Sequence, residues 1–389
     1  MNDAAARAHS ARLQALIREQ VEAAGGAIPF WRFMELALYA PGLGYYSAGA
    51  TKFGRAGDFV TAPELGPLFA EVVAGALAPV LGQVGAQARM LEIGGGSGRF
   101  AADAIARLAA LDAMPAQYAI LEPSADLRER QRALLEERLA PALLERVRWL
   151  DGPPDESWQG VLFANEVIDA LPTPRFAILG GEVYEEFVAF EEGRGFVRTE
   201  RRADALTTAA VRHVERQLEV PFADGFRSEL LPQLPYWIQA VKGGMDAGAM
   251  LFVDYGYARR EFYLPERSDG TLRAFHRHRV SGDVFANPGL QDITASVDFT
   301  ALAEAGTGAG FDFAGYCSQA GFLFGNGIDR RLAAHEERAA DEGERYALRQ
   351  QVKQLTIPGG MGESFQAMGF ERGVDFGHAF LAGDLSHRL

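Results

Sequence analysis

The chain has 389 residues, of which 48% are hydrophobic and 23% charged, so it is long enough to bury a large core in one or two domains. Its formal net charge of −14 argues against non-specific nucleic-acid binding, which needs a basic surface, and would suit a basic protein partner. Cys317 is the only cysteine, which excludes an intrachain disulfide and a thiolate zinc cluster. The scattered histidines do not indicate a metal site, and no apolar run approaches the roughly 18 residues of a membrane span. We therefore expect no bound metal, no membrane span and a cytoplasmic protein.

The first part of the chain is predicted to form an N-terminal helical cap, residues 1–84. Apolar residues recur at helical spacing over 8–24, 29–39 and 64–82. Between the last two helices, residues 41–63 mix glycines and aromatic residues without periodicity, and ordered loops of this length are often binding loops. We expect this loop to fold over a cofactor. Its candidate cofactor-binding residues are Phe53, Gly57, Asp58 and Thr61.

The next segment, residues 90–100, reads as a buried strand, a glycine-rich turn and a helix. Such a turn holds nucleotide-like ligands in α/β folds. The glycines that define it are Gly94, Gly96 and Gly98, whereas the dinucleotide fingerprint needs a sixth-position glycine where Arg99 stands. An NAD-dependent dehydrogenase is therefore disfavoured. Glu92 precedes the turn, and an acid there would attract a sulfonium cation but repel a pyrophosphate. The arrangement resembles motif I of class I S-adenosylmethionine (SAM) methyltransferases.

Polar side chains follow the later strands of the predicted sheet in the same way. Strands at 118–121, 147–150, 160–164 and 250–253 each end at an acid or an amide. In a parallel sheet the carboxyl ends of the strands meet at one edge, where ligands bind. Glu122 is placed to accept hydrogen bonds from ribose hydroxyls, although its segment could simply begin a helix. The candidate cofactor contacts at this edge are Glu92, Glu122, Ser124, Asp151 and Asn165.

Glu166 and Asp169 are the candidate catalytic acids. Spaced i, i+3 on a first helical turn, they would point to one side, and two buried anions need a cation nearby. That cation is either the sulfonium or a guanidinium or ammonium of the substrate. The alternative is a helix N-terminus at which acids favour the dipole. His276 is a second candidate, as a proton acceptor, but residues 276–279 could equally be a solvated loop or a basic patch for a partner.

After Pro172 the pattern changes from alternating strands and helices to consecutive strands. Residues 176–200 alternate as strands, and helical patterns follow at 204–218 and 227–243. This predicts an α+β insertion over about 175–245 within an α/β core of residues 85–389. A single charged, solvated helix is expected over 330–351.

Five stretches together resemble one known family. They are Lys52–Thr61, Glu92–Gly98, Asn165–Pro172, Phe252–Gly256 and Phe275–Phe299. With them the chain resembles the MidA-type SAM-dependent methyltransferases, which include the mitochondrial complex I assembly-factor methyltransferase, over roughly residues 28–380. The resemblance implies a class I, Rossmann-like α/β core with a seven-stranded sheet, an N-terminal helical cap and an insertion after strand four. It also implies SAM as cofactor, with the three glycines at its turn, Glu122 at its ribose, and Asn165 and Glu166 where substrate and methionine meet.

The family's mitochondrial members imply the activity. They methylate an arginine ω-nitrogen of a complex I subunit, so the resemblance implies a protein-arginine N-methyltransferase with a protein substrate. A small-molecule or lipid methyltransferase and a SAM-binding assembly chaperone remain alternatives. Both a monomer and a homodimer are compatible with the sequence.

Overall fold

The computed structural model describes residues 3–47, 61–276 and 279–389, which divide into two compact units. Unit 1 comprises Met1–Phe59, Ile168–Gln233 and Tyr257–Asp298, and unit 2 comprises Val60–Val167, Leu234–Gly256 and Phe299–Leu389. The division therefore differs from the boundary expected at residue 84. The reason is that α4 (Leu68–Val84) packs against α5 (Arg99–Ala110) and β5 (Trp158–Asn165) of unit 2.

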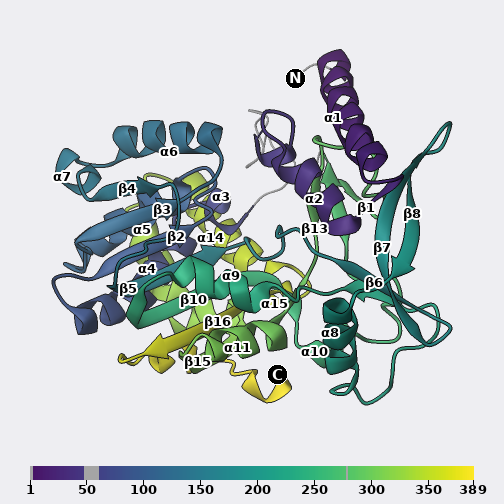
Figure 1. Cartoon of the computed structure of the whole chain (residues 1–389). Coiled ribbons are helices and arrows are strands. Elements are labelled where there is room, and N and C mark those ends of the chain that lie inside the picture. The colour runs from purple at the N-terminus through teal and green to yellow at the C-terminus, as the bar shows by residue number, and fades with distance from the viewer. Residues whose placement is uncertain (1–2, 48–60, 277–278) are drawn as a thin grey trace. The chain divides into compact units, whose positions relative to one another are not determined.

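Unit 2 is built on a mixed sheet whose main path has the strand order β15-β16-β10-β5-β2-β3-β4 (Figure 1). Besides β5, the strands of this path are β2 (Arg89–Ile93), β3 (Gln117–Leu121), β4 (Val147–Leu150), β10 (Met245–Tyr257), β15 (Asp312–Ser318) and β16 (Phe365–Arg372). Strands β4, β3, β2, β5 and β10 are parallel, whereas β16 is antiparallel to both β10 and β15. The strand order reverses between β2 and β5, which is where open α/β sheets bind their ligands.

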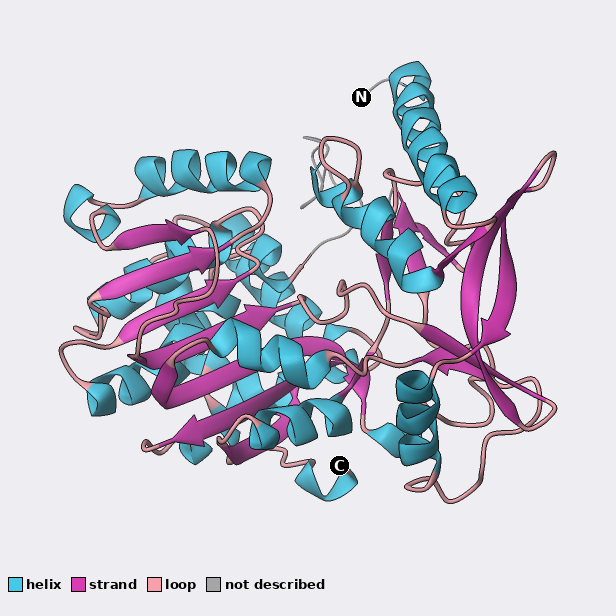
Figure 2. Ribbon diagram, viewed as in Figure 1, coloured by secondary structure: helices cyan, strands magenta, loops and turns pink. Residues whose placement is uncertain are grey.

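Helices cover both faces of this sheet, with α4 and α5 on one face and α9 (Leu234–Lys242) and α11 (Phe299–Gly308) on the other (Figure 2). Phe100 of α5 stacks on Phe163 of β5 with ring centroids 4.3 Å apart, and Phe69 of α4 meets Phe100 edge-on. The other helices of unit 2 are α3 (Ala62–Leu65), α6 (Ala125–Arg138), α7 (Pro141–Leu144), α12 (Gln319–Gly325), α13 (Ile328–Glu336), α14 (Glu342–Thr356), α15 (Met361–Ser364), η2 (Gly377–Phe380) and η3 (Ser386–Arg388).

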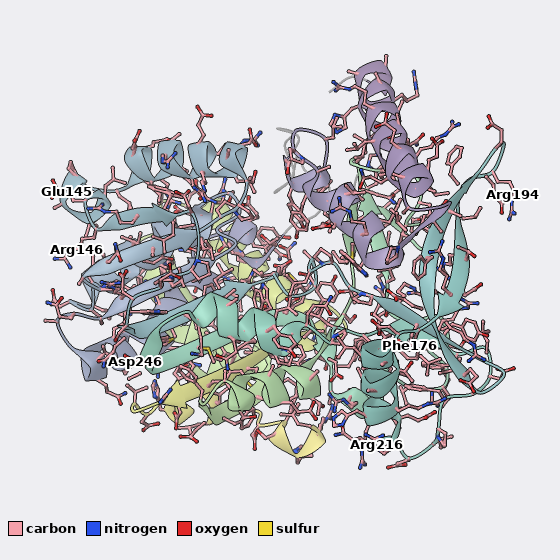
Figure 3. All side chains as sticks on the ribbon, viewed as in Figure 1. Glu145, Arg146, Phe176, Arg194, Arg216 and Asp246 are labelled. Atoms are coloured by element: carbon pink, nitrogen blue, oxygen red, sulfur yellow. The ribbon has the colours of Figure 1, made fainter. Side chains whose placement is uncertain are left out.

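Unit 1 contains an antiparallel sheet of order β1-β7-β6-β9, with β8 paired to β7, and a three-stranded sheet β12-β11-β13. The strands of these two sheets are β1 (Ala27–Pro29), β6 (Arg175–Leu179), β7 (Glu182–Glu191), β8 (Gly195–Arg202), β9 (Arg227–Glu229), β11 (Arg273–His276), β12 (Arg279–Ser281) and β13 (Asp292–Thr294). The two-residue strand β14 (Val297–Asp298) belongs to neither sheet. The helices are α1 (Asp3–Ala23), α2 (Phe30–Tyr39), η1 (Tyr45–Ser47), α8 (Ala205–Glu215) and α10 (Arg259–Phe262). Phe176 of β6 lies inside this unit, whereas Arg194 projects from the turn between β7 and β8 (Figure 3).

A buried ion-pair network stands inside unit 1. The Arg175 side chain is fully buried; its Nε lies 2.6 Å from Glu186 Oε2, and its Nη1 pairs with Glu229. Its Nη2 lies 2.9 Å from Asp269 Oδ1, and Arg227 pairs with the second oxygen of Glu186 at 2.6 Å. The glutamates are 1% and 2% exposed at their side chains, so Arg175 neutralises charges that water does not reach.

The structure confirms the seven-stranded Rossmann-like core and the antiparallel insertion. Two helix predictions were wrong. Residues 330–351 form two helices, α13 and α14, because the Asp341 side chain accepts the Glu344 N–H and starts a new helix. The helix expected over 227–243 begins only at Leu234, since residues 227–229 pair with β6 as β9. Among the described residues, no helix combines the length and the hydrophobicity needed to cross a bilayer.

Candidate functional site

The glycine-rich turn joins β2 to α5 at the point where the strand order reverses. Gly94, Gly96 and Gly98 have φ angles of 70°, 52° and 85°, a region that side chains disfavour. A Cβ on Gly94 would lie 2.8 Å from Val167 Cγ2, and one on Gly98 would lie 3.1 Å from the Gln131 Cα. Glycine is therefore required at 94 and 98 both by backbone conformation and by close packing.

Glu64 of the short helix α3 supports this turn. Its carboxylate accepts a hydrogen bond from Ser97 Oγ, and its Oε2 lies 3.2 Å from Arg99 Nε. The Glu64 side chain is 7% exposed, so the contact is largely shielded from water. Sequence reasoning missed Glu64. The available signal was an acid three residues after Thr61, which precedes α3 and is itself buried.

Glu92 is buried at the carboxyl end of β2. Tyr118 Oη donates a hydrogen bond to its Oε2 at 2.7 Å. Burial raises the pKa of Glu92 to about 7, against the opposing hydrogen bond from Tyr118 and with a smaller contribution from the charge of Glu122. Glu92 is thus close to half-protonated at neutral pH, and a cation bound nearby would favour its charged form.

Glu122 and Gln131 join the end of β3 to the glycine turn. Glu122 Oε1 accepts the Ser124 N–H at 3.0 Å, and Gln131 Nε2 lies 3.3 Å from Glu122 Oε2. The same Nε2 donates to the Gly96 carbonyl at 2.9 Å, while Trp149 Nε1 donates to Gln131 Oε1 at 2.8 Å. Gln131 is fully buried and fixes the turn relative to Glu122, a role that sequence reasoning missed. Ser124, expected to contact cofactor, is the N-cap residue of α6.

Asp151 differs from the buried acids of this edge. Its side chain is 96% exposed and pairs with Arg128 Nη1 at 2.6 Å. Arg128 also donates to the Leu150 carbonyl at 2.7 Å and to the Glu122 carbonyl. Arg128 therefore fastens the ends of β3 and β4 together, and Asp151 lies at the outside of that junction.

The segment after β5 does not form the helical turn expected for Glu166 and Asp169. The Glu166 N–H donates to the Val253 carbonyl at 2.9 Å, which continues the pairing with β10. The Val167 N–H then donates to Asp254 Oδ2 at 3.2 Å, and Glu166 takes a left-handed φ of 54°. The i, i+3 helical geometry was therefore wrong, because Asp254 captures the backbone donor that would begin a helix. Glu166 belongs to unit 2 and Asp169 to unit 1.

Asn165 provides a polar atom that fits a cofactor. Its Nδ2 donates to Glu166 Oε1 at 3.1 Å, whereas its Oδ1 is buried and has no hydrogen-bond partner within residues 3–47, 61–276 and 279–389. A buried acceptor of this kind is costly unless a donor completes it. Next to a glycine turn, it suits the ammonium group of an amino-acid-like ligand, while the Glu122 carboxylate suits hydroxyl donors.

The remaining candidates lie in unit 1 or outside the described residues. Asp169 is buried, and its carbonyl accepts the Ala295 N–H at 3.0 Å. His276 ends β11 and donates from Nδ1 to the Leu290 carbonyl at 2.6 Å, which fixes its ring. The predicted site residues are therefore divided between the two units. Three further candidates, Phe53, Gly57 and Asp58, lie outside the described residues. In the part of the chain that the structure describes, no group of three or more His, Cys, Asp or Glu residues could hold a metal ion.

Comparisons with known proteins agree with this geometry. Residues 72–317 match the family model Methyltransf_28, described as "Putative S-adenosyl-L-methionine-dependent methyltransferase". A crystal structure from Burkholderia thailandensis bound to S-adenosyl-homocysteine (SAH) superposes with a TM-score of 0.91 at 40% identity, covering 100% of this chain and 99% of that chain. A native structure of a protein from the same organism has a TM-score of 0.88 at 39% identity, with the same coverage.

Curated relatives are more distant. The protein arginine methyltransferase NDUFAF7 homolog of Drosophila melanogaster is 26% identical over 384 residues, which is 91% of this chain and 83% of that protein. The protein arginine methyltransferase NDUFAF7 of Mus musculus is 27% identical over 375 residues, 87% of this chain and 80% of that protein. Both are named as mitochondrial proteins.

Proposed function

Because this chain belongs to a family of S-adenosyl-L-methionine-dependent methyltransferases, we propose that it methylates an arginine ω-nitrogen of a protein substrate. SAM dependence is a property of the family, and the resemblance seen in the sequence is confirmed. The choice of arginine is the proposal. Its support is the buried, acid-rich carboxyl edge of the sheet together with relatives that are named protein arginine methyltransferases.

We assign the cofactor to the turn between β2 and α5. Gly94, Gly96 and Gly98 would leave room for it, Glu122 would accept its hydroxyl hydrogens, and Asn165 Oδ1 would accept from its ammonium group. Bound there, SAM supplies a methyl group on a positively charged sulfur. Glu92 would provide negative charge within the same unit. Ser124 and the exposed Asp151 are weaker candidates for contact with the cofactor.

Glu166 is the observation that carries the choice of substrate. A glutamate held at a φ of 54° is strained by about 1–2 kcal/mol. The bond from the Glu166 N–H to the Val253 carbonyl and the bond from the Val167 N–H to the Asp254 carboxylate maintain that conformation. Backbone strain of this kind persists only where the surrounding structure imposes it, and such positions cluster at active sites and ligand-binding sites.

A carboxylate at this place would perform two tasks for a guanidinium. It would accept N–H donors in a fixed orientation, and it would hold positive charge on the nitrogens that do not react. Arginine has a pKa above 12, so its nitrogen needs such help to become a nucleophile. Asp169 and His276 are proposed as further acid or base groups of the substrate site in unit 1. A subunit of respiratory complex I is the proposed protein substrate, by analogy with the mitochondrial relatives.

The test is transfer of labelled methyl groups from SAM to the whole protein extract of cells that lack this enzyme, followed by hydrolysis and identification of the labelled amino acid. We expect the label in methylated arginine. Label confined to lysine, to another residue or to a small molecule would overturn the proposal.

Glu166→Gln tests the role of the carboxylate in the same assay. It should lower turnover about 100-fold or more while SAH affinity changes less than threefold, because the amide keeps the shape but loses the charge. Glu137→Gln, at an exposed position of α6, is the matched control and should keep full activity. Full activity of Glu166→Gln would remove that residue from the reaction.

A further inference from the structure

A second group of buried polar side chains lies in unit 1, on one face of β13. Residues 292 and 294 point to the same side of the strand because side chains alternate along it. Ile293, between them, points the other way into an apolar cluster that includes Ala274 and Phe33. Asp292 and Thr294 are 2% and 3% exposed. The strand thus presents a carboxylate and a hydroxyl side by side in a site largely closed to water.

Three aromatic residues adjoin this face. Tyr46 Oη lies 3.0 and 2.9 Å from the two carboxylate oxygens of Asp292. The Tyr46 ring stacks on Tyr39 with centroids 5.5 Å apart, and Tyr45 meets Tyr46 edge-on at 5.1 Å. Tyr39 and Tyr46 are only partly buried, so this pair leaves ring surface within reach of a ligand.

The segment around Asp169 also contacts this group of residues. Tyr39 Oη donates to the Ala170 carbonyl at 2.9 Å, and the Ala295 N–H, next to β13, donates to the Asp169 carbonyl at 3.0 Å. Burial, and then the negative charges of Asp292 and Asp169 among others, raise the pKa of Tyr46 well above 10. The Tyr46 phenol stays protonated at neutral pH, and the carboxylates of Asp292 and Asp169 both lie close enough to raise its pKa.

Thr294 indicates that a ligand completes this group. Its Oγ1 is buried and makes no hydrogen bond to any of the described residues. A buried hydroxyl without a partner costs free energy, and natural structures keep few of them. Asp292 on the same face is engaged by Tyr46, so the open hydroxyl is the part of the face that awaits a partner.

We propose that Asp169, Asp292, Thr294 and the Tyr39–Tyr46 pair form a binding site in unit 1 for a guanidinium-bearing side chain. This inference rests on the proposed arginine methylation and names the residues that select its substrate. A guanidinium is a planar cation with five N–H donors and no acceptor, which matches two carboxylates, a hydroxyl acceptor and an aromatic face. Two acids repel an anion, and no set of described residues suits a metal ion, so an organic cation fits best.

The experiment is an ultraviolet difference titration of the full-length protein with N-ethylguanidinium, which follows tyrosine absorbance. Neutral N-ethylurea, of similar shape, is the reference ligand. We expect a saturable change with N-ethylguanidinium that N-ethylurea does not produce. Equal responses to the two compounds, or no saturable response, would overturn the inference.

Three variants locate the site. Thr294→Val should weaken N-ethylguanidinium binding roughly three- to tenfold while the melting temperature stays the same or rises, because valine removes an unsatisfied hydroxyl at similar volume. Asp292→Asn should weaken binding further and keeps Tyr46 as the reporter. Glu192→Gln, at an exposed turn of unit 1, should titrate like the wild type. A Thr294→Val protein that binds like the wild type would contradict the assignment, even where Asp292→Asn fails to fold.

The proposed function and this inference fail separately. If the wild type labels arginine but Thr294→Val and Asp292→Asn keep the KM for the protein substrate, the site assignment is wrong and arginine methylation stands. If the wild type labels another residue yet binds N-ethylguanidinium through Asp292 and Thr294, the site stands and the proposed reaction falls.

Discussion

At the scale of single residues, buried acids define the chemistry of the parallel sheet. Glu92 and Glu122 are 3% and 4% exposed, and both have hydrogen-bond donors from their own unit. Glu92 has a pKa of about 7, well above its ordinary value of 4.5, mainly because it is buried. Such a group lowers the stability of the ligand-free protein while making the site receptive to a cation.

The pH dependence of stability should report Glu92 directly. Between pH 4.5 and 7 the folded protein holds a proton on Glu92 that the unfolded chain releases, so the free energy of unfolding falls as the pH rises through this window. Glu92→Gln should remove this fall and stabilise the protein above pH 7 by up to about 3 kcal/mol. Urea unfolding of wild type and variant at pH 5 and pH 8 measures it. Equal stabilities of the two proteins at pH 8 would show that the buried charge of Glu92 does not cause the fall in the free energy of unfolding.

Sequence patterns revealed these residues better than their partners. Glu92 and Glu122 could be predicted because each follows a buried strand. Gln131 could not, since it lies on a helix of mostly charged residues. Glu64, in a four-residue helix after a loop, had only its spacing from Thr61 as a signal. The turn at Glu166 could not be predicted either, because it depends on Asp254, which lies far away in sequence.

At the scale of elements, the short helix α3 supports the glycine turn. Glu64 accepts from Ser97 Oγ and pairs with Arg99, so one side chain ties the helix to the loop and to the first residue of α5. The turn is thus held from one side by α3 and from the other by Gln131 of α6. Its shape depends on elements on both sides of it in the sequence.

Glu64→Ala should weaken SAH binding several-fold and cost about 1–2 kcal/mol of stability, because a shielded hydrogen bond and an ion pair are lost together. Calorimetric titration with SAH and thermal unfolding measure the two effects. Glu156→Ala is the matched control: Glu156 pairs with Arg89 at the opposite end of β2, and its side chain is 65% exposed. That change should leave both quantities nearly unaltered, and an equal loss in the two variants would argue against a specific role of α3.

At the scale of the whole molecule, two units with separate cores share one chain. Unit 1 is assembled from three stretches of sequence and unit 2 from the other three. The insertion could be predicted from alternating residues, whereas the membership of residues 257–298 in unit 1 could not, because short strands separated by loops give little periodicity. Unit 1 depends on a buried ion-pair network, and unit 2 on a larger apolar core.

Arg175→Met should destabilise unit 1 by about 3–5 kcal/mol, since it leaves the buried carboxylates of Glu186 and Glu229 without their main counter-ion. SAH affinity should change less than threefold, because its proposed contacts lie in unit 2. Urea unfolding and SAH titration test both statements. Arg194→Met removes an exposed pair with Glu191 and should have little effect on either. Unchanged stability of Arg175→Met would show that the network does not hold unit 1.

The most direct measurement is calorimetric titration of the wild type, Gly98→Ala and Gly85→Ala with SAH. Both glycines have left-handed φ angles, 85° and 91°, but only Gly98 is crowded, with the Gln131 Cα 3.1 Å from an added Cβ. The backbone alone should cost Gly98→Ala about 1 kcal/mol of stability, and it should cost Gly85→Ala up to about 3 kcal/mol, because its ψ of −159° lies in a region that only glycine adopts readily. We predict that only Gly98→Ala also loses SAH affinity, by tenfold or more, because the turn it opens would hold the cofactor. A folded Gly98→Ala protein that binds SAH as tightly as Gly85→Ala would contradict the assignment of the cofactor to this turn.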